Sequence, residues 1–462
     1  YLEKRLETVI SILGTAAAGG AFVPVNPVLK PRQVAFILRD SGARILVTSR
    51  ERLRTMEATL AELAELRSII VVGGEPDAST ALIDVVAWES LPAGSGDRPR
   101  PLIDKDLCAI LYTSGSTGSP KGVALTHRNL LAGAESVNTY LPNTSDDVIL
   151  AALPLSFDAG LSQLTTGFAA GAHVVLMNYL LPRDVVRMCD LHGVTALTCV
   201  PPLWIQLAEQ DWGSAGANLR YFANTGGRMP RVTLDKLRVC FPRAKPFLMY
   251  GLTEAFRSTY LDPEQVDLRP DSIGKAIPNN EVLVMRSDGT LCGPGESGEL
   301  VHRGALVALG YWNDPERTAE RFRPLTGGNG PWASPEIAVW SGDLVRTDEE
   351  GYLYFVGRSD EMIKTSGYRV SPTEIEEAAH ATGMVRDAVA FGVPDDERGQ
   401  RVILIVAADG AFDLAGFSAE LRGDLPNFMV PSRIVLREEI PRGANGKYDR
   451  VALRHEFESS AT

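Results

Sequence analysis

The chain has 462 residues, of which 45% are hydrophobic and 23% are charged. These fractions lie near the averages of globular proteins and exclude a wholly disordered chain, a collagen and a coiled coil. The formal net charge of −12 argues against broad nucleic-acid binding, because such binding needs a basic surface. The length predicts about three domains, or fewer if one α/β unit is large.

The cysteines and histidines do not indicate a metal centre. Five cysteines are scattered without a C-x-x-C pair, and six histidines form no H-E-x-x-H motif. A sparse, odd set of cysteines is typical of reduced thiols, so we expect a cytoplasmic protein without structural zinc. The sequence contains no run of about 20 apolar residues, so no membrane span is predicted. Residues 9–25 are apolar, but Glu3 and Glu7 precede them where a signal peptide has positive charge.

The predicted elements alternate between helices and strands from the start of the chain. A first helix is expected to end near Gly19-Gly20, followed by a strand at 21–25. Amphipathic helices are expected at 32–39 and 51–66. Apolar runs of strand length occur at 43–47, 68–72, 148–152 and 174–177. This alternation predicts an α/β fold of layered sheets with parallel strands.

A smaller domain is predicted at the C-terminal end. After an apolar strand at 352–356 the pattern becomes shorter and of α+β type. There Ser371-Pro372-Thr373-Glu374 predicts a helix N-terminus, with Ser at the capping position and Pro at the first helical position. Two apolar strands follow. We therefore predict a large domain at 1–358 and a small domain at 359–462.

The strongest signal for function is a Gly- and Ser-rich loop after a strand. An apolar strand at 107–112 runs into the sequence TSGSTGSPKG at 113–122. Backbone N–H groups, small hydroxyls and one ammonium together suit a bound anion. The loop is not a Walker motif, because Pro120 and Gly122 replace the Gly and the Ser or Thr of that motif. The candidate phosphate-binding residues are Thr113, Ser114, Gly115, Ser116, Thr117, Gly118 and Lys121.

Further motifs follow this loop in a fixed order. They are Thr225-Gly-Gly-Arg228, Tyr250-Gly-Leu-Thr-Glu254, Ser341-Gly-Asp343, Gly357-Arg-Ser-Asp360 and Pro441-Arg-Gly-Ala-Asn-Gly-Lys447. Together with the segment 107–127 they resemble the motifs of the AMP-forming carboxylate ligases, which include acyl-CoA synthetases, luciferases and nonribosomal adenylation domains. Gly443 departs from the family pattern, which has Thr there. The family also has further residues before the segment at which this chain starts, so we expect a truncated N-terminus.

The resemblance implies roles for these residues. Asp343 would accept from both ribose hydroxyls, as a carboxylate can, and Arg358 would contact the same ribose or a phosphate. Glu254 would bind Mg²⁺, and Thr253 would donate to the α-phosphate. Lys447 resembles the mobile catalytic lysine of the family. The remaining residues expected to bind the nucleotide are Gly226, Gly227, Arg228, Tyr250 and Gly251.

The resemblance also implies a reaction in two steps. A carboxylate and ATP form an acyl-adenylate and pyrophosphate, and a thiol of CoA or of a carrier protein's phosphopantetheine then displaces AMP. The family turns its small domain about the residue that corresponds to Asp360. This movement would bring Lys364 and Gly367 to the path of the thiol. ATP, Mg²⁺ and the thiol are therefore the expected cofactors and co-substrates.

The substrate pocket is expected to include Phe157, Asp158, Asn224 and Leu252. Asp158 resembles the residue that pairs with the α-ammonium of the substrate in amino-acid-activating domains, but a helix-capping or solvent-facing role stays open. Arg257 could contact a substrate carboxylate or phosphate; the sequence alone favours a plain salt bridge.

Three functions compete at this point. The first is an acyl-CoA ligase or acyl-carrier-protein ligase acting on a small carboxylic acid. The second is an amino-acid adenylating enzyme, for example of prolyl type, that loads a separate carrier protein. The third is a non-catalytic nucleotide-binding relic, which the joint presence of Lys121, Glu254 and Lys447 disfavours. Within the family, the sequences of residues 224–230 and 250–260 most resemble those of the acyl-CoA ligases associated with the exosortase A system.

Overall fold

The computed structural model describes most of the chain as two compact units. One unit comprises Tyr1–Val282 and His302–Val339, and the other comprises Leu283–Val301 and Trp340–Thr462. The described residues are 1–74, 83–92, 94, 101–113, 120–325, 335–358, 361–365, 368–395, 399–425, 427, 429–443 and 447–459, with only the backbone at 364, 368, 369, 399, 458 and 459.

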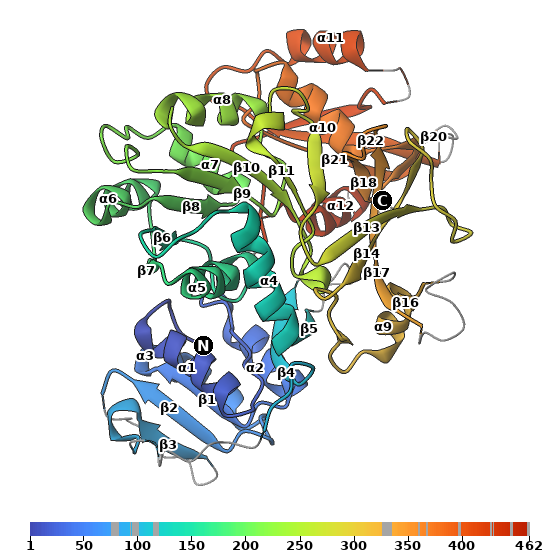
Figure 1. Ribbon diagram of the computed structural model, residues 1–462. Helices are drawn as coiled ribbons and strands as arrows, with labels where there is room; N and C mark the ends of the chain where they lie inside the picture. The colour runs from blue at the N-terminus through green and yellow to red at the C-terminus, as the bar shows by residue number, and fades with distance from the viewer. Residues whose placement is uncertain are drawn as a thin grey trace. The chain divides into compact units, whose positions relative to one another are not determined.

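The main sheet of the first unit is built on five parallel strands (Figure 1). Their order is β7-β6-β8-β9-β10, and β11 and β12 extend the sheet beyond β10 with antiparallel pairing. All residues of β8 and β9 are buried, as expected for central parallel strands covered on both faces. The strands are β6 Val148–Ala151, β7 His173–Leu176, β8 Ala196–Cys199, β9 Tyr221–Asn224, β10 Lys245–Tyr250, β11 Thr259–Leu261 and β12 Ser272–Ala276.

Helices alternate with these strands along the chain, and α5 lies against β6 and β7 (Figure 1). Gly167 permits that close approach, and Gly160 permits the close approach of the segment that leads from β6 into the helix. A Cβ at Gly167 would lie 2.5 Å from Val174 Cγ2, and one at Gly160 would lie 1.9 Å from the carbonyl oxygen of Pro154. The helices are α4 His127–Tyr140, α5 Asp158–Ala170, α6 Pro182–His192, α7 Pro201–Ala208 and α8 Arg231–Cys240, with short 3₁₀ turns η2 Thr253–Ala255 and η3 Pro263–Gln265.

Two smaller sheets complete the first unit. Strands β1, β2 and β3 pair in parallel, and the antiparallel strands β15, β5 and β4 form the other sheet. The elements are α1 Leu6–Ala17, α2 Pro31–Ser41, β1 Ile45–Ser49, α3 Arg50–Leu60, β2 Ser68–Val72, β3 Asp84–Ala87, η1 Trp88–Ser90, β4 Leu107–Thr113, β5 Lys121–Thr126, β15 Gly310–Tyr311, α9 Pro315–Arg321 and β16 Phe322–Pro324.

The second unit contains its own sheets and its own hydrophobic clusters. Strands β13, β14, β17 and β18 lie in that order, and β20-β19-β22-β21 form a second sheet in which β23 pairs with β22. The ends of β13, β14 and β17 at 280–282, 302–304 and 337–339 belong to the first unit, so His302 is counted there. Apolar side chains of β21 and β22 fill a cluster on each face. The elements are β13 Asn280–Met285, β14 Ser297–Gly304, β17 Ile337–Thr347, β18 Leu353–Arg358, β19 Ile363–Thr365, β20 Tyr368–Val370, α10 Pro372–Ala381, β21 Asp387–Asp395, β22 Gly399–Ala407, α11 Leu414–Asp424, β23 Arg433–Arg437 and α12 Arg450–Ser459.

These elements confirm the predicted α/β class and its parallel strands. The strand expected at 21–25 is wrong, because Phe22 forms only an isolated bridge with Ala109. Ser371 does occupy the capping position of α10, yet its side chain makes no capping hydrogen bond. The domain boundary predicted at residues 358 and 359 stays a prediction, since residues 359–360 lie outside the described chain. None of the described helices has both the length and the apolar character that a bilayer crossing requires.

Gly160 provides a test of the packing of α5. Gly160→Ala is expected to lower the free energy of unfolding by about 1–3 kcal/mol, because the added methyl meets backbone that must move. Gly14→Ala in α1 is the matched control: its Cβ would meet nothing within 4 Å, so a gain of about 0.5–1 kcal/mol is expected. Urea denaturation of both variants measures the difference, and equal stabilities would contradict the packing argument.

Candidate active site

The predicted site residues of the first unit gather at one edge of the main sheet. Asn224 and Tyr250 are the last residues of the neighbouring parallel strands β9 and β10, and Phe157-Asp158 begins α5 after β6. In open α/β sheets, ligands bind outside the carboxyl ends of the strands. The topology therefore brings together motifs that are up to about a hundred residues apart in the sequence.

A buried three-residue cluster lies just after β10. The ammonium of Lys121 donates to Glu254 Oε1 and to Tyr311 OH, at 2.7 Å each. The Tyr311 hydroxyl in turn donates to the same Glu254 oxygen at 2.7 Å. Lys121 Nζ also lies 4.3 Å from the centre of the Tyr311 ring. The cluster joins β5, η2 and β15, so three separate segments are tied together through one carboxylate.

The charges of this cluster determine the protonation of its neighbours. Burial acts to raise the pKa of Glu254, but the charge of Lys121 and the hydrogen bonds from Lys121 and Tyr311 outweigh it, so the pKa is lowered. Glu254 therefore remains ionised at neutral pH. His302, on β14, is fully buried, and neither ring nitrogen has a hydrogen-bond partner among the described residues. Burial lowers its pKa to about 3, against a smaller opposing effect of Glu254.

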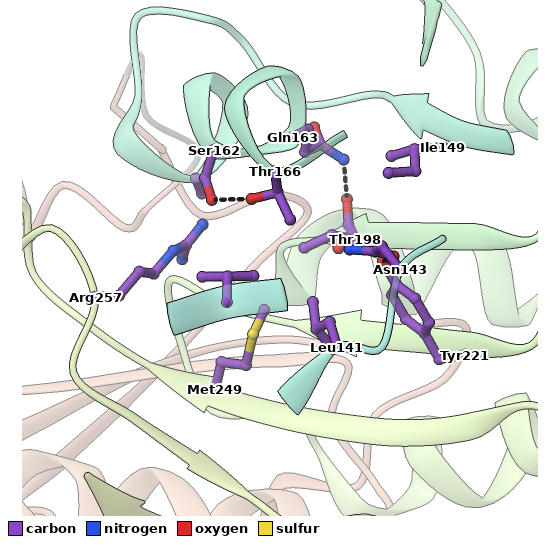
Figure 2. A pocket seen from close by; sticks show the side chains of 12 residues that line it. Leu141, Asn143, Ile149, Ser162, Gln163, Thr166, Thr198, Tyr221, Met249 and Arg257 are labelled. Carbon is purple, nitrogen blue, oxygen red and sulfur yellow. Dashed lines mark hydrogen bonds between the residues drawn. The ribbon is translucent and has the colours of Figure 1, made fainter. Parts of the chain in front are cut away.

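A mostly neutral cavity lies between α5 and the strands (Figure 2). Its empty volume is about 330 Å³, part of which is open to solvent. Ser162 and Thr166 of α5 hydrogen-bond to each other at 3.3 Å, and Gln163 donates to Leu150 O and Thr198 O. The twelve residues that line the cavity are Val137, Leu141, Asn143, Ile149, Ala159, Ser162, Gln163, Thr166, Thr198, Tyr221, Met249 and Arg257.

Arg257 points into this cavity from the segment after η2 (Figure 2). The residue is 4% exposed, and its Nη1 donates to Thr225 Oγ1 at 3.1 Å. Its Nε has no hydrogen-bond partner, and no carboxylate of the described chain forms an ion pair with it. The salt bridge favoured from the sequence is therefore wrong for the described residues.

Other buried polar atoms near the strand ends also lack hydrogen-bond partners within the described chain. They are Thr113 Oγ1, Ser156 Oγ, Asn224 Oδ1 and Ser258 Oγ. Most buried polar groups in proteins are hydrogen-bonded, so such a group of exceptions indicates a place for a polar ligand. Asn224 uses its amide nitrogen to bind Gly227 O at 2.7 Å, which leaves its oxygen available.

The remaining nucleotide-site candidates of this unit occupy the surface around these atoms. Gly226 has a φ of 77°, which favours glycine, and with Gly227 it forms the exposed turn after β9. Arg228 pairs with Asp271 at 2.5 Å. Gly251, Leu252 and Thr253 follow β10 and are half-buried. The loop residues Ser114, Gly115, Ser116, Thr117 and Gly118 lie outside the described residues.

In the second unit, Asp343 and Arg358 stand opposite each other on β17 and β18. Arg358 Nη1 lies 3.6 Å from Asp343 Oδ1. Asp158 of the first unit is the first residue of α5, so it does not occupy the capping position, which Phe157 holds. The backbone of Lys364 lies in β19, while Asp360 and Gly367 lie outside the described chain.

Lys447 is exposed and closes a short hairpin of the second unit. Arg442 and Tyr448 form a β-bridge across the hairpin, and Gly443 N donates to Lys447 O at 2.8 Å. Both Arg442 Nη2 and Tyr448 OH donate to Asp387 Oδ1, at 2.9 Å and 2.6 Å. A buried acidic residue of β21 thus holds the base of the loop that presents Lys447.

Several residues of this site belong to no motif in the sequence. Tyr311 and His302 were not candidates, because no motif links them to Glu254, from which they are 57 and 48 positions distant in the sequence. The polar residues of α5 did carry a signal. Ser162, Gln163 and Thr166 are buried polar residues in a helix whose other buried residues are apolar or Gly, and buried polar side chains need partners or a ligand.

His302 gives the site a measurable pH dependence. A histidine whose pKa falls from 6.5 to about 3 on folding binds a proton only in the unfolded chain between these values. The free energy of unfolding should therefore fall by up to about 1.4 kcal/mol per pH unit as the pH drops below about 6.5. Denaturation midpoints measured from pH 7 to pH 4.5 test this. His302→Gln and His302→Leu should both flatten the slope; an unchanged slope in both would contradict the assignment.

The chain is similar to proteins of one family along its whole length. The sequence profile of AMP-binding enzymes matches residues 1–312, and that of the AMP-binding enzyme C-terminal domain matches residues 374–447. A long-chain-fatty-acid–CoA ligase of Escherichia coli O157:H7 is 30% identical, over 98% of this chain and 84% of that protein. Surfactin synthase subunit 2 of Bacillus subtilis (strain 168) is 29% identical over 98% of this chain, which spans only 12% of that synthase.

A solved structure shows the same fold. ATP-bound MatB from Rhodopseudomonas palustris superposes with a TM-score of 0.86 at 25% identity, over 100% of this chain and 88% of that one. The narrower resemblance to the exosortase A-associated ligases stays a prediction. The profile match, the relatives and the shared fold together establish that the chain belongs to the family of AMP-binding enzymes, as its ordered motifs predict.

Proposed function

We propose that the protein activates a carboxylic acid with ATP and then transfers the acyl group to a thiol. In the first step a carboxylate oxygen attacks the α-phosphorus, pyrophosphate leaves, and an acyl-adenylate forms. In the second step the thiol attacks the acyl carbonyl, AMP leaves, and a thioester forms. The observation that carries the proposal is the Lys121–Glu254–Tyr311 cluster at the end of β10, which brings an ammonium and an ionised carboxylate together.

Phosphoryl chemistry of this kind depends on positioning and on charge. Thr113 and Lys121 are opposite each other in the β4–β5 ladder, so their side chains share a face. The unpartnered Thr113 hydroxyl and the Lys121 ammonium can therefore hold phosphate oxygens together. Asp343 and Arg358 would bind the ribose, and Lys447 would supply a second ammonium to the developing negative charge.

Mg²⁺ fits the chemistry of Glu254. The carboxylate is ionised, and Mg²⁺ prefers one or two carboxylates combined with phosphate oxygens and water. The ion would supply positive charge that neutralises the phosphates. In its absence the Lys121 ammonium neutralises the same carboxylate, which explains how a buried charge is tolerated.

CoA is the proposed acceptor thiol, with a carrier protein as the alternative. The relative that shares most of its length with this chain is named as a CoA ligase. The peptide synthases match this chain over only a small part of their own length. The alternative, in which the protein loads an amino acid onto a carrier, therefore depends mainly on Asp158. We infer a cytoplasmic location from the sparse cysteines, as stated above. The first test is ATP–pyrophosphate exchange by the purified chain with fatty, aromatic, dicarboxylic and amino acids.

Lys447 is expected to be needed for the first step. Lys447→Ala should lose at least about 100-fold in ATP–pyrophosphate exchange, since one preorganised charged donor contributes about 3–4 kcal/mol in comparable sites. The exposed Lys105 provides the control, because Lys105→Ala removes an equal charge at a position that belongs to none of the motifs. Near-normal exchange by a folded Lys447→Ala protein would refute the catalytic role.

Asp360 is expected to act only between the two steps. Proline fixes φ, so Asp360→Pro should hinder a rotation at this residue while leaving adenylate formation intact. Pyrophosphate exchange should stay within about threefold of wild type, and thioester formation with CoA should slow by at least about tenfold. Equal losses in both assays would exclude a hinge at this position.

A further inference from the structure

The cavity contains one buried positive charge that the adenylation step does not use. Arg257 lies in the cavity wall, whereas Lys121 and Glu254 do not line that cavity. The guanidinium therefore faces a different space from the cluster that we assign to the phosphates. The space that it faces is lined by neutral side chains, which include Ser162 and Thr166 (Figure 2).

The backbone holds Arg257 in this direction. The preceding Phe256 has a φ of 52°, which is unfavourable for a bulky residue and persists only where the surroundings enforce it. Its ring is fully buried against Gly133 of α4, where an added Cβ would lie 2.4 Å from Phe256 Cδ1. Such strain is concentrated at functional sites in proteins. The turn that it produces directs the next side chain into the cavity.

No negative charge of the described chain balances this guanidinium. Its hydrogen bond to Thr225 is with a neutral hydroxyl, and within the described residues Arg257 forms no ion pair with a carboxylate. The nearby phenols do not serve as anions. Burial raises the pKa of Tyr140 to about 12, despite the opposing charge of Arg257, and burial raises the pKa of Tyr221 further. Both hydroxyls are already bonded, to Met249 Sδ and Asn143 Oδ1.

An uncompensated buried charge is costly, so a ligand that supplies the opposite charge is favoured. We propose that Arg257 binds a second anionic group of the substrate, so that the preferred acids are small dicarboxylic acids of which one carboxylate is activated. The inference rests on the proposed function. A planar guanidinium with free N–H groups suits a carboxylate, and the neutral residues around it offer no competing charge.

The test compares acids of equal chain length in ATP–pyrophosphate exchange. Succinate, adipate and suberate are set against butanoate, hexanoate and octanoate. Wild-type protein should favour the best dicarboxylate over its monocarboxylate by at least about 100-fold in kcat/KM, because a site with a buried polar group rejects substrates that leave it unpaired. Comparable activity on both series would overturn the proposal, whatever any variant does.

Substitution of Arg257 locates the preference. Arg257→Gln should raise KM for the dicarboxylate by at least about 100-fold with little loss for the monocarboxylate, and Arg257→Lys should recover part of the preference. Arg243→Gln is the matched control, since Arg243 is exposed and bonds only to the carbonyl of Ala217. A preference that persists in Arg257→Gln would assign it to other residues and refute this role.

Calorimetric titration of the same dicarboxylates without ATP separates the two proposals. The protein could bind a dicarboxylate, lose that binding in Arg257→Gln, and yet show no exchange activity on any acid. That result would refute the proposed function and retain the anion site. Absence of both binding and exchange would refute both. Titration with 3-phosphonopropanoate in place of succinate shows whether the second group must be a carboxylate or whether another anion is also bound.

Discussion

The ion pair between Lys121 and Glu254 is the interaction on which the organisation of the site depends. The two residues are 133 positions apart and meet only because β5 and the end of β10 converge. Each charge is largely buried and would be unfavourable without the other. Tyr311 adds a hydrogen bond to both, so a third segment is fixed by the same two charges.

The cavity beside this cluster has a different electrostatic character. The cluster is balanced within the protein, whereas the cavity holds the guanidinium of Arg257 among neutral groups. When the two charges of this pair separate, the ammonium can bind a phosphate and the carboxylate can bind a metal ion. Each charge then still has an opposite charge beside it. An unbalanced arginine instead favours whatever anion enters. The proposed place for phosphates and the proposed place for the acid therefore differ in their charge balance.

The second unit stabilises the loop of Lys447 by a related arrangement. Asp387 accepts from both Arg442 and Tyr448, and the Arg442 guanidinium also lies 4.0 Å from the centre of the Tyr448 ring. These contacts fix both ends of a hairpin whose lysine remains exposed. The catalytic role proposed for Lys447 needs a rigid base under the residue, and these contacts supply one.

The sequence by itself determined the α/β class and the family, because these depend on local periodicity and on short contiguous motifs such as 113–122 and Tyr250–Glu254. The strand Ser68–Val72 was predicted at its observed bounds, because a buried strand appears in the sequence as a short continuous apolar run. Only the tertiary structure showed that Tyr311 and His302 lie close to Glu254 and that Arg257 lacks a carboxylate partner. Pairing between distant residues depends on the order of the strands and on the direction of the side chains. Neither can be inferred from the spacing of residues within a short segment of sequence.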